Sequence, residues 1–172
     1  MRRALPGALV LGVAIAMAVG ADRTAAQATA RVERTPQLLI VRVPGAFDDV
    51  LAVFLEEIKR RNYVVTGVNH LDDALAQRLA DLGGDPLGYE RYKIVGFCNL
   101  TLADKAIRQD PHVGALMPCR AVVFKRPGVP ETTIATFRPS FVATALGFQG
   151  MDRLLGEADA DILAILARVV GE

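Results

Sequence analysis

Apolar residues follow two different rhythms along this chain, and the rhythm changes several times. Short runs rich in β-branched and aliphatic residues predict strands, whereas apolar residues at three- and four-residue steps predict helices. The predicted strands are residues 37–43, 63–68, 91–98, 119–125 and 131–138. The predicted helices are residues 47–61, 71–82, 100–108, 140–146, 151–155 and 159–170.

The order of these elements predicts the fold class. Strands alternate with helices at first, and the last two strands form a hairpin around Pro127-Gly128. We therefore expect an α+β domain, a two-layer sandwich in which a mixed sheet of about five strands has helices packed on one face. This single domain takes up residues 37–172, with helices at 140–170 after the last strand. Residues 29–36 are polar and form a flexible lead.

The first 28 residues have a pattern of their own. Arg2 and Arg3 precede an uncharged apolar run from Ala4 to Ala21, and Ala26-Gln27-Ala28 places small residues where a signal peptidase cuts. This pattern predicts a secretory signal, and therefore a periplasmic or secreted protein. The run is short for a membrane anchor, and no later run is long enough to span a bilayer. We expect no stable membrane span once the signal is cleaved.

Cleavage changes the charge and leaves room for one core. Of 172 residues, 144 remain, which is enough for a single domain. The signal carries three arginines against one aspartate, so a net charge of +1 for the whole chain becomes −1 for the mature protein. A nearly neutral domain offers no electrostatic reason to bind nucleic acid.

Motifs of the common enzyme classes are missing from the sequence. It contains no nucleotide-binding glycine loop, no G-x-S-x-G elbow, no C-x-x-C pair and no H-E-x-x-H pair. The mature chain has one serine, Ser140, at a predicted helix start, where an N-cap role is expected. Hydrolase chemistry is therefore the least expected function, and we expect a binding protein rather than an enzyme.

Two histidines are candidate ligands. His70 follows the second predicted strand, where an imidazole can face a cleft and bind a metal or haem iron, or transfer protons. It can equally be a partly exposed turn residue. His112 follows Asp110-Pro111 in a predicted turn, where simple solvent exposure is expected.

Two cysteines are candidates for redox chemistry. Cys98 ends the third predicted strand and Cys119 begins the fourth. Two cysteines in an exported protein suggest a disulfide. However, a seven-residue strand is about 23 Å long and a disulfide needs Cα atoms within about 7 Å, so the pair can meet only if the strands are antiparallel. A disulfide, two buried free thiols and a redox or sulfur-handling pair all remain open.

The central block carries motifs that resemble a known family. They are residues 92–99 (YKIVGFCN), Leu102-Ala103, Asp110-Pro111 and residues 114–123 (GALMPCRAVV). Together with Asn69-His70, where many relatives have Asp-His, they resemble the domain of unknown function 302 family over residues 38–138. Asn99-Leu100 departs from the Asn-Pro that is usual in that family.

The resemblance implies a small α+β fold that tends to form homodimers and has no agreed activity. Some members hold haem b between subunits, and some accompany bacterial sulfur oxidation. By this resemblance, His70 is the expected axial ligand of a haem b that is non-covalent, since C-x-x-C-H is absent. The second ligand stays open between His112 and a cysteine thiolate. The alternatives are a periplasmic redox or sulfur-oxidation accessory protein acting through Cys98 and Cys119, and an interaction domain without chemistry.

Overall fold

The computed structural model describes residues 31–84 and 88–172, so the predicted signal at residues 1–28 lies outside the described chain. The strands are β1 (Val32–Arg34), β2 (Leu38–Pro44), β3 (Val64–Asn69), β4 (Arg91–Cys98), β5 (Cys119–Lys125) and β6 (Glu131–Phe137). The helices are α1 (Phe47–Arg60), α2 (Leu71–Ala76), α3 (Leu79–Leu82), α4 (Leu100–Gln109), the 3-10 helix η1 (Pro111–Leu116), α5 (Pro139–Ala145) and α6 (Asp152–Val169). None of the helices in the described ranges is both long and apolar enough to cross a membrane.

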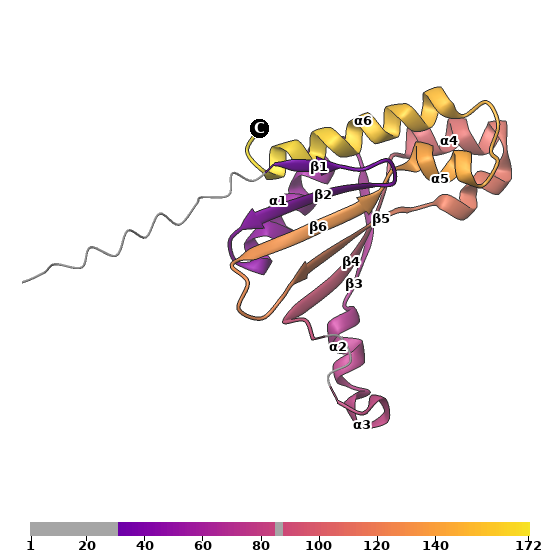
Figure 1. The fold of residues 1–172 in the computed structure, drawn as a ribbon. Coiled ribbons are helices and arrows are strands. Elements are labelled where there is room, and N and C mark those ends of the chain that lie inside the picture. Colours follow the sequence, from indigo (N-terminus) through magenta and orange to yellow (C-terminus); the bar gives the residue numbers. More distant parts are fainter. Residues whose placement is uncertain (1–30, 85–87) are drawn as a thin grey trace, which may run out of the picture.

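The strands form one sheet in the order β1-β2-β6-β5-β4-β3, and α1 and α6 pack against one of its faces (Figure 1). The predicted two-layer α+β architecture is therefore confirmed. All strand pairs are antiparallel, so the expectation of a mixed sheet was wrong in this detail. The reason is that the helical connections from β3 to β4 and from β4 to β5 each begin and end at the same end of the sheet, so the next strand runs back in the opposite direction. Periodicity alone does not show whether a connection crosses the sheet.

A sixth strand was not expected. Residues 32–34 fall in the predicted flexible lead, yet they form β1, which pairs with β2 so that Val32 lies opposite Val41. Three residues are too few for an alternating pattern to stand out.

The main core lies between the sheet and helices α1 and α6. Alternate residues of β4 point inward, and Phe97 lies at the centre of the core, with its ring centroid 6.1 Å from that of Phe54 at an interplanar angle of 82°. The predicted stripe of the first helix is confirmed, because its buried residues are Phe47, Val50, Phe54 and Ile58. They meet the buried residues Ile162, Ile165, Leu166 and Val169 of α6.

Apart from shifts of one residue at helix ends, three features of the predicted helices differ in the structure. The helix expected over residues 71–82 is interrupted at Gln77-Arg78, with neither glycine nor proline at the break. Conversely, residues 152–169 form one continuous helix where two were expected. Ser140 is not the N-cap of α5: Arg138 takes that position, and the Ser140 hydroxyl donates to Asp159 instead.

A second, smaller core closes the end of the sheet where β4 stops and β5 begins. It joins α4, η1, α5 and the start of α6, and its buried residues are Ala106, Val113, Ala143, Met151 and Leu155. The side chain of Asn99 starts α4 by accepting hydrogen bonds from the backbone N–H groups of Thr101 (3.0 Å) and Leu102 (3.2 Å). This cap turns the chain sharply after Cys98.

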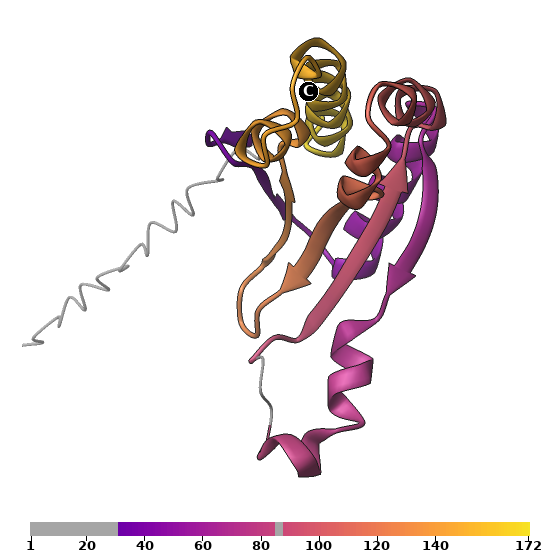
Figure 2. The same ribbon diagram turned by 90° about the vertical axis from the view of Figure 1, so that its right-hand side faces the viewer.

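At the other end of the molecule, α2 and α3 project away from the sheet (Figures 1 and 2). We call residues 71–82 the α2–α3 arm, and neither of its helices has a buried residue. The arm is attached through Lys93 of β4, whose side chain is buried. The Lys93 ammonium lies 2.6 Å from Asp72 Oδ1 and 2.8 Å from Asp73 Oδ2.

Candidate functional site

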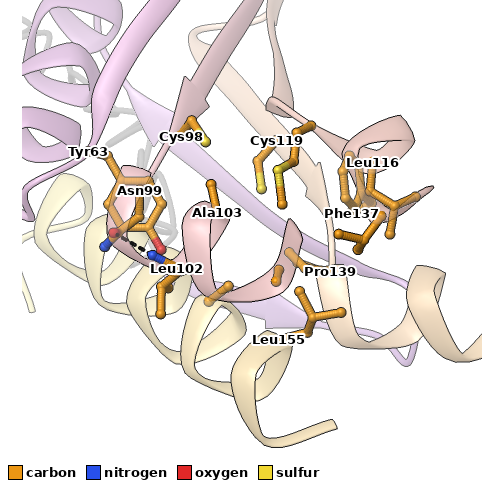
Figure 3. A pocket seen from close by; sticks show the side chains of 14 residues that line it. Tyr63, Cys98, Asn99, Leu102, Ala103, Leu116, Cys119, Phe137, Pro139 and Leu155 are labelled. Carbon is orange, nitrogen blue, oxygen red and sulfur yellow. Dashed lines mark hydrogen bonds between the residues drawn. The ribbon is translucent and has the colours of Figure 1, made fainter. Parts of the chain in front are cut away.

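A small cavity of about 40 Å³ lies between the sheet end and the second core (Figure 3). Most of its wall is aliphatic or aromatic. Three sulfur-containing side chains line it, namely Cys98 at the end of β4, Met117 just before β5, and Cys119 at the start of β5. The cavity therefore brings together both cysteines that the sequence singled out.

The antiparallel pairing of β4 and β5 explains why both cysteines line the same cavity. Phe97 lies directly opposite Cys119, so Cys98 is the next residue along the neighbouring strand. The expectation that an antiparallel arrangement would bring the two ends together is confirmed. Both cysteines are free thiols in the structure.

The environment of the thiols makes them poor nucleophiles. Burial, with smaller contributions from Cys98 and Asp159, raises the pKa of Cys119 to about 12. Burial also raises the pKa of Cys98. A reactive cysteine needs the opposite, an electropositive setting that lowers the thiol pKa. Burial of the thiols thus disfavours nucleophilic redox chemistry at these two residues.

Alkylation should reveal this directly. In the folded protein at pH 8 we expect iodoacetamide to modify Cys119 about 1000-fold more slowly than in the unfolded chain, because the raised pKa depletes the thiolate by that factor. Mass spectrometry of the modified peptide gives the two rates. Equal rates in the folded and guanidinium-unfolded protein would show that the thiol is neither buried nor suppressed.

The remaining polar groups on the cavity wall are already engaged. The Tyr63 hydroxyl lies 3.2 Å from Asp161 Oδ2 and donates to it. Burial, together with the charge of Asp161, raises the pKa of Tyr63 above its usual range. The Asn99 carboxamide oxygen accepts the two backbone N–H groups at the start of α4. Among the side chains of the cavity wall, the sulfur atoms are thus the remaining lone-pair donors.

His70 lies at the base of the α2–α3 arm, directly after β3. Its side chain is 58% exposed, and Nδ1 lies 3.3 Å from Asp73 Oδ2. Asp73 in turn accepts a hydrogen bond from the Lys93 ammonium. This contact holds one nitrogen of the ring toward the carboxylate, while Nε2 has no hydrogen-bond partner among the described residues.

The structure does not bring His70 together with the other candidate ligands of its own chain. His112 lies in η1 at the opposite end of the sheet, 87% exposed, with Nδ1 2.9 Å from Asp110 Oδ1. Asn69, the neighbour of His70, pairs with Ile94, which is four residues or about 13 Å along β4 from Cys98. Within the described ranges no cluster of three or more His, Cys, Asp or Glu side chains could hold a metal ion.

A wider hollow of about 510 Å³ lies on the sheet face that α1 and α6 leave uncovered. Its lining residues all belong to β3, β4 and β5, and Gly67, Gly96 and Arg120 are among them. Because only strands of one sheet line this hollow, it is open on the side away from the sheet. It cannot enclose a ligand within one chain.

Three contributors to these sites were missed from the sequence. Asp73 was not singled out from the sequence, although its i+3 spacing from His70 was a usable signal. Met117 lies two residues before Cys119 in the sequence, but it was not predicted to be a sulfur ligand. Tyr63 reaches the cavity through strand pairing, which the sequence does not display.

Comparisons with known proteins agree on the fold. The family model of "Domain of unknown function DUF302" matches residues 39–169, so the match continues through the C-terminal helices, beyond the motifs at residues 38–138. A solved structure, the uncharacterized conserved protein DUF302 from Bacillus stearothermophilus, is similar with a TM-score of 0.65 at 19% sequence identity. The similarity covers 77% of this chain and 97% of that one. No curated protein matches this chain.

Proposed function

This chain belongs to the DUF302 family, and from that premise we propose that it is an exported homodimeric binding protein that holds haem b between two copies, with His70 as an iron ligand. The observation that carries the proposal is the orientation of the His70 ring. Asp73 engages Nδ1, and Nε2 is left without a partner among the described residues. The export part rests on the signal pattern of residues 1–28.

The contact with Asp73 suits a metal-binding histidine. A carboxylate at one ring nitrogen commonly fixes the tautomer and raises the basicity of the other nitrogen, which then binds the metal. Here Lys93 holds Asp73 in place through a 2.8 Å ion pair. The series Lys93, Asp73 and His70 thus presents Nε2 at the surface in a defined orientation.

The α2–α3 arm supplies the apolar surface that a porphyrin needs. Four leucines follow His70 at three- or four-residue steps, and none of them is buried, namely Leu71, Leu75, Leu79 and Leu82. Ligand sites for flat cofactors are mostly apolar, with few polar groups to fix orientation. Leucines beside one exposed imidazole match this composition.

One chain supplies only one wall of such a site, which supports the homodimer. The sulfur-lined cavity of about 40 Å³ is far too small for haem, and the hollow on the sheet is open on the side away from the sheet. A second copy related by a two-fold axis would bring an identical arm and a second His70. Bound haem would supply redox-active iron, whereas the chain itself would bind and orient it.

The test is a hemin titration of the purified mature protein, followed by its Soret absorption. We expect saturation at one haem per two chains. His70→Ala removes the iron ligand and should weaken haem binding by more than about 100-fold. Asp73→Asn removes only the residue that orients this ligand and should weaken haem binding by about 10-fold.

His112→Ala is the matched control, because His112 is also exposed and also contacts a carboxylate through Nδ1. It should bind haem as the wild type does. The proposal fails if no saturable Soret band forms, or if His70→Ala and His112→Ala behave alike.

A further inference from the structure

The sulfur-lined cavity has a donor set that the proposed haem site does not use. Among the residues that line it, the Tyr63 hydroxyl is hydrogen-bonded to Asp161, and the Asn99 carboxamide oxygen accepts the backbone N–H groups at the start of α4. The thiols of Cys98 and Cys119 and the thioether of Met117 remain. An apolar chamber whose free donors are all sulfur selects for a soft ligand.

We propose that this cavity binds a single Cu(I) ion through Cys98 Sγ, Cys119 Sγ and Met117 Sδ. Thiolate and thioether sulfur are the ligands that favour Cu(I) among the biological metals. The site is separate from the haem site, because His70 follows Asn69, which pairs with Ile94 about 13 Å along β4 from Cys98. It therefore stands or falls independently of the proposed function.

Size and ligand number argue against other occupants. A cavity of about 40 Å³ holds an ion or a water molecule and not an organic cofactor. Structural zinc takes four nitrogen, sulfur or carboxylate ligands, and no such group exists among the described residues. Calcium and magnesium require several oxygen ligands, which the cavity wall does not offer.

Binding of the ion displaces protons from the thiols. When Cu(I) enters, both thiols lose their protons to solvent, and each thiolate forms a sulfur–copper bond, because the thiolate and not the thiol is the metal ligand. The Met117 thioether coordinates through a neutral lone pair. The ion and its two thiolates together carry a net charge of −1. Two protons are released for each ion bound, and no electron is transferred in this step.

The sulfur atoms are carried by well-anchored backbone. Cys98 and Cys119 belong to neighbouring strands and lie at the end of their hydrogen-bonded ladder, where Phe97 pairs with Cys119. α4 and α6 form part of the chamber wall, to which they contribute Ala103, Leu155 and Ala158. A site built on strands and packed helices keeps its donors in place without the ion.

An anaerobic competition titration tests the proposal. The mature full-length domain is titrated into the Cu(I)–bicinchoninate complex, and loss of the complex's colour reports transfer. We expect one Cu(I) per chain. Cys98→Ser and Cys119→Ser should each lower the affinity more than about 100-fold, and Met117→Leu, which conserves volume, about 10-fold. His70→Ala should bind Cu(I) normally, which separates this site from the haem site.

A second measurement protects the result from misfolded variants. X-ray absorption at the copper edge of the wild-type complex should show sulfur neighbours alone. Nitrogen or oxygen neighbours would overturn the assignment, as would failure of the wild type to take Cu(I) from the chelator. Recovery of a Cys98–Cys119 disulfide from the exported protein would also overturn it, because the thiols would then be unavailable.

Discussion

Phe97→Ala should lower the free energy of unfolding by about 3–5 kcal/mol. The Phe97 side chain is fully buried at the centre of the sheet's inner face. Its ring meets Phe54 edge-on and lies 6.0 Å from the ring of Tyr63, so the truncation removes two aromatic contacts and leaves a cavity. Domains of this size have a total stability of about 5–15 kcal/mol, so the variant is expected to be marginal.

Urea denaturation followed by circular dichroism measures this loss. The matched control is Phe141→Ala on α5, where the side chain is 38% exposed and the expected loss is below about 1 kcal/mol. Similar losses for the two variants would mean that Phe97 is not the centre of the core. Because Tyr63 also lines the sulfur cavity, Phe97→Ala should weaken Cu(I) binding as well.

Lys93→Met should cost about 1–3 kcal/mol and should loosen the α2–α3 arm. The substitution keeps the length of the side chain but removes the ammonium from a position that is only 2% exposed. Asp72, which is largely covered, then loses its 2.6 Å partner and keeps only backbone N–H donors and the more distant Arg91. Faster amide hydrogen exchange in residues 71–82 would report the freed arm.

The same pair predicts how stability depends on pH. Burial raises the pKa of Asp72, but the Lys93 ammonium and the backbone N–H groups of Tyr92 and Asp73 outweigh it and hold the pKa below its usual value. Burial lowers the pKa of Lys93, but its hydrogen bonds to Asp72 and Asp73 outweigh that effect and raise it. A carboxylate with a depressed pKa stabilises the fold above its unfolded pKa of about 3.9, and this contribution disappears as the pH falls through the folded value.

The raised pKa of Lys93 has the opposite effect on the pH dependence of stability. Its contribution is complete below the unfolded pKa of about 10.4 and is lost as the pH rises through the folded value. Denaturation curves between pH 2 and 11 should therefore show both losses in the wild type and smaller ones in Lys93→Met. Lys105→Met, an exposed lysine on α4, is the control and should follow the wild type. A Lys93→Met curve that matches the wild type at every pH would contradict the role assigned to the pair.

Local patterns predicted the elements better than their connections. The bounds of β4 and β5 agree with the prediction residue for residue, and Asn99 and Pro118, which are unfavourable in strands, mark the end of β4 and the start of β5. α1 was predicted to within one residue from its apolar stripe. β1 was missed since three residues carry too little pattern, and the strand directions were missed since they depend on where each helix returns to the sheet.

The candidate sites were harder to predict than the fold. Cys98 and Cys119 were identified, but their meeting depends on the antiparallel register that sets Phe97 opposite Cys119. His70 was identified by its position after a strand. Its partner Asp73 was overlooked because one helix-start charge looks like another until the contact with Lys93 is seen. Met117 was overlooked because a lone methionine in a sequence usually indicates packing.

The two outermost strands have a consequence for how copies of this chain can associate. A strand at the edge of a sheet has unpaired backbone N–H and C=O groups that can pair with a strand of another chain. Here one edge is β1, with only three residues, and the other is β3, whose ladder is interrupted by a register shift between Val65 and Gly67. Short or irregular borders are poor templates for strand addition. Two copies should therefore meet through faces and side chains, without merging their sheets into one, and the same feature should limit growth into fibrils.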